Sequence, residues 1–258
     1  MARTALVTGG GRGIGRAIAL ALARAGCAVA VGGRGRDALE AAAQEARALG
    51  VKALALILDV GDPAAIAGAM RRVSAELGPV DVLVNNAGVA ESATLARTDP
   101  ELWERHLRVN ATGPYLLSRE VLPGMLERRW GRIINVASLA GLHGSPYVTA
   151  YTASKHALVG FTRALAMEVA GKGVTVNALC PGYVATDMVW NGARNIAERT
   201  GRSFDEAVAS MARMNPGGRL VEPDEIAAVA VGLLDDDTTN GQALVLDGTA
   251  PAPARRPT

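Results

Sequence analysis

The sequence predicts an α/β fold built on a doubly wound, parallel sheet of seven strands. The first observation is that short aliphatic runs alternate regularly with longer stretches of helical periodicity. The second is that runs such as Val82-Leu83-Val84 are apolar throughout, which is typical of parallel strands covered on both faces. Right-handed crossovers then place helices on both sides of the sheet.

The strand and helix patterns assign most of the chain. Seven segments have the pattern of strands: Thr4–Thr8, Ala28–Val31, Ala53–Leu58, Val82–Asn85, Arg132–Ala137, Val174–Cys180 and Ala243–Asp247. The helical segments between them are Gly15–Ala25, Asp37–Leu49, Pro63–Leu77, Pro100–Arg128, Tyr151–Ala170 and Pro223–Leu234. We expect residues 1–249 to form a single domain, followed by a disordered tail over residues 250–258, which are rich in Pro, Ala and Arg.

One connection is too long for a plain loop. It covers about residues 186–220, between the sixth and seventh strands, and carries several Met and aromatic residues. Insertions beside the carboxyl ends of strands often form lids over a ligand. The alternative is a surface helical hairpin with a small core of its own.

Composition excludes several classes of protein. The chain has 258 residues, of which 49% are hydrophobic and 3% aromatic, and its formal net charge is +2. The apolar content is too high for a disordered chain, and the aromatic content is too low for a platform that stacks single-stranded nucleic acid. The small net charge indicates no polyanionic partner, so we expect no nucleic acid partner.

Cysteine usage and the N-terminal sequence favour a cytoplasmic protein. Cys27 and Cys180 have neither a disulfide pattern nor a metal-ligand spacing, and we expect two buried thiols. Met1-Ala2-Arg3 leads directly into the first strand, and that apolar strand is too short to be the hydrophobic core of a signal peptide. No apolar run is long enough to span a membrane.

A glycine-rich loop follows the first strand. It reads Thr8-Gly9-Gly10-Gly11-Arg12-Gly13-Ile14-Gly15, or TGxxxGxG, and a helix begins at once. Glycines allow a tight turn, and a helix N-terminus offers N–H groups and a positive dipole end to a pyrophosphate. The spacing differs from GxGxxG because Ile14 occupies the third glycine position. A flexible strand–helix turn is the alternative, but the position of the loop favours phosphate binding.

Further motifs follow along the chain in a fixed order. They are Asn85-Asn86-Ala87-Gly88, Asn110, Ser138, Tyr151-Thr152-Ala153-Ser154-Lys155, and Pro181-Gly182 with Thr186. With the glycine loop they resemble the short-chain dehydrogenase/reductase family over about residues 3–248. The resemblance implies a Rossmann-like fold, a nicotinamide cofactor, and hydride transfer between a ketone and a secondary alcohol. It also implies a homotetramer, in which the two longest helices pair with their copies in neighbouring subunits.

Four residues are predicted to be catalytic: Asn110, Ser138, Tyr151 and Lys155. Hydride transfer to a carbonyl creates an alkoxide that needs a proton, and a phenol with its ordinary pKa of about 10 is a poor proton shuttle at neutral pH. A nearby cation stabilises the phenolate, so we expect Lys155 to lower the pKa of Tyr151. Tyr151 and Lys155 lie four residues apart, on one face of a helix. The resemblance gives Ser138 a carbonyl-polarising hydrogen bond and Asn110 the support of a water chain from Lys155. An ordinary amphipathic helix face, and a helix kink at Asn110, are the alternatives.

The cofactor preference depends on the end of the second strand. Enzymes that use NAD usually carry an acid there, whereas Gly32-Gly33-Arg34 has none, and the Arg34 guanidinium suits a 2′-phosphate. NADP(H) is therefore favoured, with NAD(H) and a solvated Arg34 as the alternative. The resemblance extends the cofactor site to Gly9, Arg12, Gly13, Ile14, Gly15, Arg34, Asp59, Val60, Asn86, Ala87, Gly88, Tyr151, Lys155, Pro181, Gly182, Val184 and Thr186.

The substrate is the least defined part of the prediction. The segments around Tyr151 and Pro181 are most similar to the ketoreductases of fatty-acid and polyketide synthesis, which implies a 3-oxoacyl thioester or similar ketone. The alternatives are an NAD-dependent dehydrogenase of a small hydroxy acid, alcohol or sugar, and a non-catalytic dinucleotide sensor. We expect His143, Tyr147, Met188 and Trp190 at the substrate pocket, although the lid residues could form lid core instead. His106 and His156 are expected on helix surfaces or at packing seams, and no metal site is expected.

Overall fold

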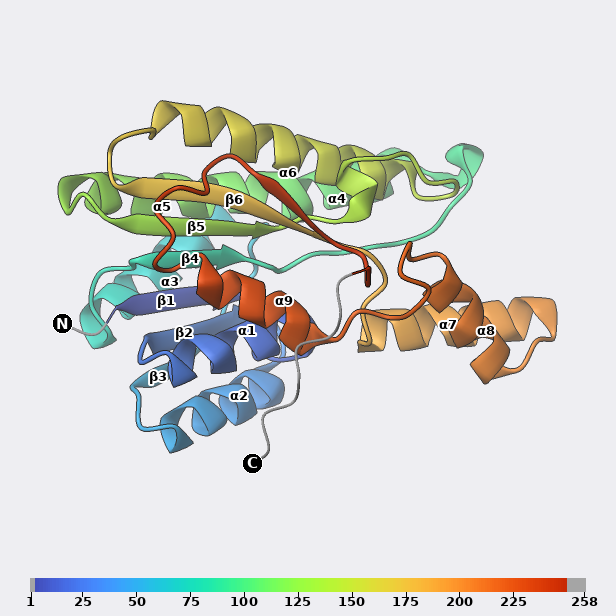
Figure 1. Ribbon diagram of the computed structural model, residues 1–258, viewed down its shortest axis with the longest axis horizontal. Coiled ribbons are helices and arrows are strands. Elements are labelled where there is room, and N and C mark those ends of the chain that lie inside the picture. The colour runs from blue at the N-terminus through green and yellow to red at the C-terminus, as the bar shows by residue number, and fades with distance from the viewer. Residues whose placement is uncertain (1–2, 250–258) are drawn as a thin grey trace.

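Seven parallel strands form one sheet in the computed structural model, which describes residues 3–249 (Figure 1). Their order across the sheet is β3-β2-β1-β4-β5-β6-β7, which confirms the predicted doubly wound α/β fold. The strands are β1 Thr4–Thr8, β2 Ala28–Gly33, β3 Ala53–Ile57, β4 Val82–Asn85, β5 Gly131–Val136, β6 Val174–Pro181 and β7 Ala243–Leu246. The predicted tail, residues 250–258, lies outside the described residues.

Strand ends differ from the prediction where pairing overrides local propensity. β1 and β4 are as predicted, but β2 continues through Gly32 and Gly33, which pair with Leu56 and Ile57 of β3. Glycine disfavours strands, so the prediction ended β2 two residues early, at Val31. Regular pairing with a neighbour therefore fixes where this strand ends.

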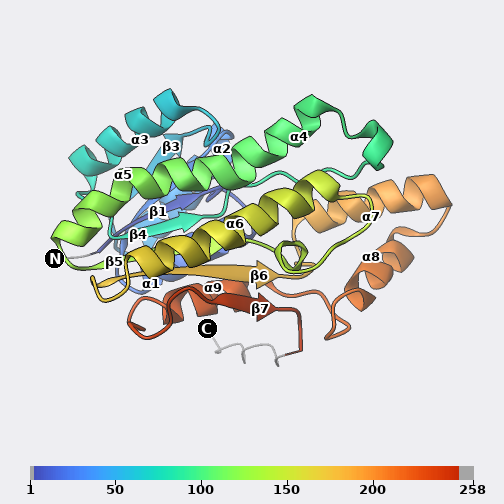
Figure 2. The same ribbon diagram turned by 90° about the horizontal axis from the view of Figure 1, so that it is seen from above.

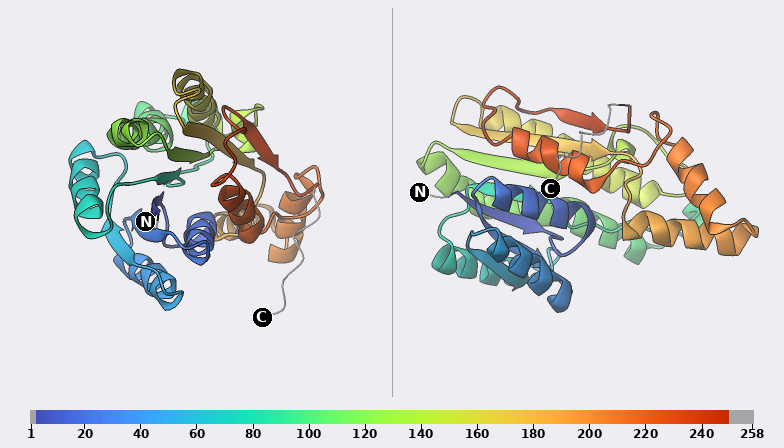
Figure 3. Two further views of the ribbon diagram at one scale, coloured as in Figure 1. Left: turned by 60° about the vertical axis from the view of Figure 1, so that its left-hand side comes forward. Right: turned by 60° about the horizontal axis from the view of Figure 1, so that its bottom comes forward.

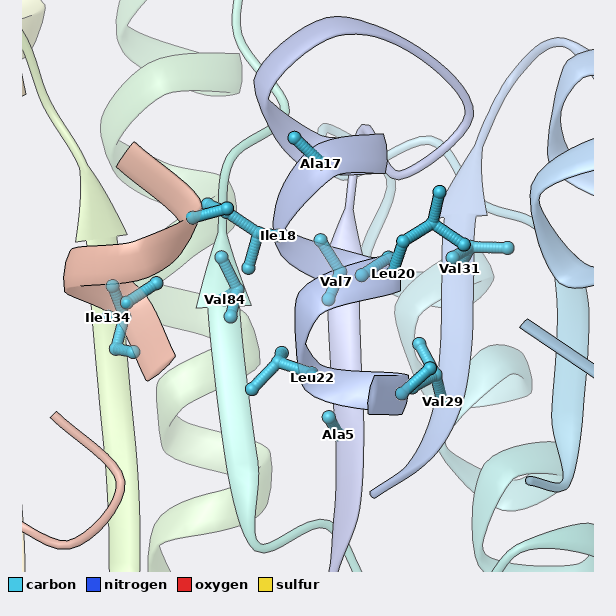
Figure 4. Packing of buried hydrophobic residues seen from close by; sticks show 14 of the residues in the cluster. Ala5, Val7, Ala17, Ile18, Leu20, Leu22, Val29, Val31, Val84 and Ile134 are labelled. Carbon is cyan, nitrogen blue, oxygen red and sulfur yellow. The ribbon is translucent and has the colours of Figure 1, made fainter. Parts of the chain in front are cut away.

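Helices cover both faces of the sheet (Figures 1 and 2; Figure 3 shows two further views). One face is covered by α1 Gly13–Arg24, α2 Arg36–Ala48 and α9 Pro223–Gly232. The other is covered by α3 Pro63–Glu76, α5 Gly113–Glu127 and α6 Thr149–Glu168. Figure 4 shows Ile18 and Leu22 of α1 directed at the sheet, where Val7 and Val84 lie. Alternate residues of each strand thus enter opposite cores, as expected for buried parallel strands.

The prediction of one continuous helix over Pro100–Arg128 is wrong. The chain forms α4 Pro100–Leu107, a π-helical turn Arg108–Thr112, and then α5. Pro114 has no N–H to donate to the carbonyl of Asn110, and a proline ring crowds that carbonyl, so regular α-helical bonding is lost there. The wider turn places Asn110 in a buried position.

The predicted lid consists of two helices, α7 Asp187–Thr200 and α8 Phe204–Arg213. They lie beyond the end of the sheet toward which the arrowheads of β6 and β7 point (Figure 2). Their facing sides form a small cluster of buried residues, Val189, Ala193, Ala207 and Met211. The segment therefore has its own small core, as the alternative predicted, and it lies beside the carboxyl ends of the strands. We keep the name lid for it, and its closure over a ligand stays a prediction.

Candidate active site

The glycine loop is shaped by close contacts that exclude side chains. Gly9 and Gly13 have positive φ angles of 65° and 52°, which favour glycine. A Cβ atom on Gly15 would lie 2.3 Å from the carbonyl oxygen of Gly9. Within the described residues, no side chain caps the first turn of α1, and that turn holds no acid. Its N–H groups are thus left for an anion at the carboxyl end of β1.

Asn86 fastens this loop to the end of β4. Its amide Nδ2 donates to the carbonyl oxygens of Thr8 and Gly9, at 2.9 and 3.2 Å. In return, the hydroxyl of Thr8 accepts from the backbone N–H groups of Asn86 and Ala87, each at 3.0 Å. Sequence analysis assigned Asn86 and Ala87 to the cofactor site but missed Thr8. Thr8 could have been found from the sequence, because it is a hydroxyl residue that ends a strand directly before a glycine loop.

The end of β2 carries a free cation. Arg34 is exposed and, among the described residues, forms no ion pair. Arg12 is also exposed, but its guanidinium lies 3.8 Å from the carboxylate of Asp187 at the start of α7. Asp59, after β3, accepts from the N–H of Gly61 at 2.8 Å, and Val60 beside it is buried. Arg34 is therefore available to a phosphate at this edge of the sheet.

The structure brings Ser138, Tyr151 and Lys155 together. Ser138 follows β5, and its side chain lies within reach of that of Tyr151, in the first turn of α6, so that a hydrogen bond between them acts on the Tyr151 pKa. The Ser138 oxygen also accepts from the N–H of Ala140 at 3.1 Å. The ammonium of Lys155 lies 5.8 Å from the centre of the Tyr151 ring, one helical turn along α6. A serine, a phenol and an ammonium thus share one small volume.

Burial governs the protonation of this group. Burial lowers the pKa of Lys155 from its ordinary value of 10.5 to about 8. Burial raises the pKa of Tyr151, and the hydrogen bond with Ser138 opposes that rise. The predicted lowering of the Tyr151 pKa is therefore wrong for the described chain, because removal from water raises the pKa by more than the hydrogen bond with Ser138 lowers it.

Asn110 connects the loop after β4 with α6. Its Oδ1 accepts from the N–H of Val89 and its Nδ2 donates to the carbonyl of Val89, both at 2.9 Å. Nδ2 also donates to the hydroxyl of Ser154 at 2.9 Å, and that hydroxyl donates to the carbonyl of Tyr151. A Cβ atom on Gly88 would lie 3.2 Å from Asn110 Oδ1 and 3.7 Å from Lys155 Nζ. Asn110 is thus near Lys155, and Ser154 is a site residue that sequence analysis missed.

The segment after β6 leads from the site to the lid. Pro181 ends the strand, and Thr186 approaches the glycine loop, where a Cβ atom on Gly13 would lie 3.2 Å from its methyl group. Val184 is buried and forms an isolated bridge with Val221. A Cβ atom on Gly182 would lie 2.2 Å from Oδ1 of Asn215, so only glycine leaves room for the asparagine side chain here.

Asn215 fastens both ends of the lid and was missed from the sequence. Its Oδ1 accepts from the N–H of Tyr183 at 2.8 Å. Its Nδ2 donates to the carbonyls of Tyr183 and Arg219, at 2.9 and 2.6 Å. This role could not be predicted, because a single asparagine in a loop does not indicate from the sequence which backbone groups its side chain will bind.

The predicted substrate residues differ in their surroundings. His143 and Tyr147 are exposed in the loop before α6, and the carbonyl of Tyr147 accepts from the N–H of Ala93 at 2.8 Å. Met188 is exposed on α7. Trp190 packs beside Phe204 in the lid cluster, with ring centres 6.3 Å apart. Trp190 therefore contributes to lid packing, as the alternative prediction had it.

The remaining sequence expectations concern cysteine, histidine, metals and membranes. Cys27 and Cys180 are both buried and free, as predicted. His106 is buried at the seam between α4 and α6, whereas His156 is exposed on α6. Within residues 3–249, no cluster of three or more His, Cys, Asp or Glu side chains could hold a metal ion. No helix in that range is long and apolar enough to cross a bilayer.

Comparison with known proteins places the chain in a family. Residues 3–197 match the family described as short chain dehydrogenase. The chain is 42% identical over 237 residues to the acetoacetyl-CoA reductase of Shinella zoogloeoides, with 92% of each chain covered. It is 39% identical over 235 residues to the 3-oxoacyl-[acyl-carrier-protein] reductase FabG of Haemophilus influenzae, with 91% of each covered.

Solved structures agree with this assignment. An actinorhodin polyketide ketoreductase variant crystallised with NADPH matches with a TM-score of 0.90 at 39% identity, covering 96% of both chains. The L-sorbose reductase of Gluconobacter frateurii, complexed with NADPH and L-sorbose, matches with a TM-score of 0.91 at 30% identity, covering 96% of this chain and 95% of that one. The chain is therefore a member of the short-chain dehydrogenase/reductase family, a family of oxidoreductases that use a nicotinamide dinucleotide.

Proposed function

We propose that this protein uses NADPH to reduce the ketone of a 3-oxoacyl thioester to a secondary alcohol. The observation that carries the proposal is the grouping of Ser138, Tyr151 and Lys155 after β5, at the same edge of the sheet as the glycine loop, which leads into the uncapped helix α1. The names of the relatives support the substrate class, since they include an acetoacetyl-CoA reductase and a 3-oxoacyl-[acyl-carrier-protein] reductase.

The glycine loop fits a dinucleotide. Gly9 and Gly15 leave no room for a Cβ atom, and the positive φ of Gly13 favours glycine. The N–H groups that open α1 suit a pyrophosphate. Asn86 holds the loop in this shape, and Thr186 closes one side of it. When bound there, the nicotinamide cofactor supplies the hydride that adds to the carbonyl carbon.

Tyr151 then provides the proton. Its hydroxyl transfers a proton to the carbonyl oxygen as that oxygen gains negative charge, and the Ser138 hydroxyl donates a hydrogen bond in the same place. Once the alkoxide is protonated, the single hydroxyl proton of Ser138 can turn to the phenolate oxygen that is left behind and stabilise it. The nearby ammonium of Lys155 also favours the phenolate. Asn110 holds the loop after β4, whose Gly88 lies close to the Lys155 ammonium.

We propose NADP(H) as the preferred cofactor. Arg34 is exposed beside the end of β2 without a carboxylate partner in the described chain, and no acid stands at Gly32 or Gly33. A ribose 2′-phosphate can form bidentate hydrogen bonds with such a guanidinium. Arg12, in the glycine loop, adds a second cation at the same edge, partly offset by Asp187.

We propose that the protein works as a cytoplasmic homotetramer in which residues 1–249 form one domain. Apolar side chains on the outer faces of α5 and α6 support the assembly, since Tyr115 is 44% and Met167 81% exposed. The two thiols, Cys27 and Cys180, are free, which suits a reducing compartment.

One relative favours a second function. The chain is 42% identical to a D-beta-hydroxybutyrate dehydrogenase of Cupriavidus necator, with 90% of each chain covered. The same catalytic group could oxidise a small hydroxy acid, because proton and hydride transfer are reversible.

A substrate panel separates the two functions. Purified protein is given NADPH with acetoacetyl-CoA or a 3-oxoacyl N-acetylcysteamine thioester, and separately NAD⁺ with 3-hydroxybutyrate. We expect kcat/KM for the thioesters with NADPH to exceed that for 3-hydroxybutyrate with NAD⁺ by at least about tenfold. A preference for the hydroxy acid would replace the first function with the second, and binding of NADPH without turnover of any substrate would contradict both.

A further inference from the structure

His106 is a buried side chain to which the proposed mechanism gives no role. It belongs to α4, has 0% of its surface exposed, and lies against α6. Its Nδ1 lies 2.8 Å from the carbonyl oxygen of Leu102, one turn earlier in α4. Its Nε2 accepts from the backbone N–H of Glu91 at 3.2 Å, in the loop that follows β4. Both ring nitrogens therefore have partners.

These two partners fix the state of the ring. A carbonyl oxygen only accepts, so Nδ1 of His106 carries the proton and donates to Leu102. A backbone N–H only donates, so Nε2 presents its lone pair to Glu91. The imidazole is therefore neutral, in one tautomer and one orientation, and any rotation of the ring breaks a buried hydrogen bond.

The fixed ring lies against Tyr151. The centres of the two rings are 6.4 Å apart and their planes meet at 80°, which is a T-shaped contact. The direction of the Tyr151 ring determines where its hydroxyl points, and a displacement of about 1 Å at a reacting group can cost on the order of 100-fold in rate. A neighbour that cannot rotate therefore limits the directions open to the phenol.

His106 and Asn110 act on the same loop. Asn110 holds Val89 through both backbone groups, and His106 holds Glu91 two residues further on. The same two side chains reach α6, since Asn110 donates to Ser154 and His106 contacts Tyr151. The segment from α4 through the π-helical turn thus joins the loop after β4 to α6 at two points.

We propose that His106 is a positioning residue for ketone reduction. It fixes the loop at Glu91 through Nε2 and restricts the ring of Tyr151 through its own immobile imidazole. The inference depends on the proposed function, because it gives His106 an effect only through the hydroxyl of Tyr151 and the adjoining loop.

The test compares variants at His106 with a matched histidine on α6. His106→Phe keeps an aromatic ring but removes both hydrogen bonds, whereas His106→Gln offers a carbonyl oxygen to the N–H of Glu91. His156→Gln is the control, because His156 is exposed and its Nδ1 bonds to Thr152 within the same helix. Each variant is measured for kcat, ketone KM, NADPH affinity and melting temperature, in wild type and in a Tyr151→Phe background.

We expect His106→Phe to lower kcat about tenfold with unchanged NADPH affinity, and His106→Gln to recover most of the loss. In the Tyr151→Phe background His106→Phe should cause little further loss, because the hydroxyl it positions is absent. Wild-type kcat in a folded His106→Phe protein, or an equal loss in both backgrounds, would overturn the inference. If His106→Phe does not fold, His106→Leu, which is narrower and also lacks hydrogen-bonding groups, replaces it in the same comparison.

The two proposals fail in different ways. If Tyr151→Phe alone keeps normal turnover, the proposed function of Tyr151 is wrong. If Tyr151→Phe is inactive while His106→Phe and His106→Gln are normal, only the role of His106 is wrong.

Discussion

The ammonium of Lys155 donates a hydrogen bond of 2.7 Å to the backbone carbonyl of Val136, the last residue of β5. Because Ser138 follows two residues later, this bond ties α6 to the strand that carries the serine. The same buried position lowers the pKa of Lys155 to about 8. One contact thus fixes the geometry of the site while the surrounding burial sets the charge of the lysine.

Lys155 makes stability depend on pH in a defined direction. Its pKa is about 8 in the folded chain and near 10.5 when exposed, so the unfolded state binds more protons between these values. The lysine therefore destabilises the fold most below pH 8, and its cost falls as pH rises toward 10.5. The slope is about 1.4 kcal/mol per pH unit.

Urea unfolding of wild type and Lys155→Met, both without cofactor, measures this effect. The free energy of unfolding of wild type should gain on that of the variant as pH rises through this interval. A difference between the two proteins that stays constant with pH would show that Lys155 keeps its ordinary pKa.

Tyr151→Phe removes one hydroxyl and keeps the ring that packs against His106. We expect ketone reduction to fall by about 100-fold or more, since the loss is that of a general acid, with NADPH affinity little changed. Steady-state kinetics and a cofactor titration measure the two quantities. Tyr115→Phe, at an exposed position on α5, is the control and should keep wild-type turnover. Normal turnover in folded Tyr151→Phe would remove the tyrosine from the mechanism.

Arg34 is expected to set the cofactor preference. Wild type should favour NADPH over NADH by about tenfold or more in kcat/KM, near 1.4 kcal/mol. Gly33→Asp combined with Arg34→Ala should reverse the ratio, because the carboxylate repels a phosphate and accepts from a ribose diol. Arg36→Ala, an exposed arginine at the start of α2, tests whether any loss of charge has the same effect. A wild-type preference for NADH would mean that Arg34 is only a solvated residue.

Asn215→Ala should loosen the lid. The change removes the amide that pairs with the part-buried backbone groups of Tyr183 and Arg219. Loss of a hydrogen-bond partner costs about 1–3 kcal/mol for a fully buried group and less for a part-buried one, so the melting temperature should fall and the KM for the ketone should rise. Asn191→Ala, an exposed position on α7, provides the comparison. Equal melting temperatures and KM values for the two variants would contradict this role.

Light scattering tests the proposed assembly. Wild type at micromolar concentration should have the mass of a tetramer, and a stable monomer would exclude it. Met167→Asp, on the outer face of α6, should weaken the assembly because it introduces a charge into an apolar contact. Met188→Asp is the matched control, since Met188 is also exposed but lies on the lid, and it should leave the mass unchanged.

The fold could be predicted because its signals are local. Apolar runs such as Val82-Leu83-Val84 identify buried strands, and TGxxxGxG marks the turn into α1. The helix Pro100–Arg128 was predicted to be continuous, and a kink at Asn110 was only the alternative interpretation of that residue, although Pro114, four residues later, is a signal of the break. The apolar residues before and after this turn both repeat with the helical period, so the sequence pattern does not show the change of hydrogen bonding between the two helices.

The site could be predicted in part. The motifs indicated Asn110, Ser138, Tyr151 and Lys155, whose grouping depends on strand order. Sequence could not show that burial reverses the expected shift of the Tyr151 pKa, because burial is a property of the packed chain. Asn215 and His106 were equally hidden, since each acts through backbone groups of distant residues, which carry no sequence signature.

The bonds between Asn86 and the carbonyls of Thr8 and Gly9 have a consequence for the thermodynamics of cofactor capture. A loop already held in its final shape loses little conformational freedom when a dinucleotide arrives, so little of the interaction energy goes into ordering it. Heat-capacity and entropy changes on binding should therefore arise from desolvation and from the lid rather than from the loop. Asn86→Ala would shift that cost onto the cofactor and weaken its affinity, even though the contacts made in the complex remained the same.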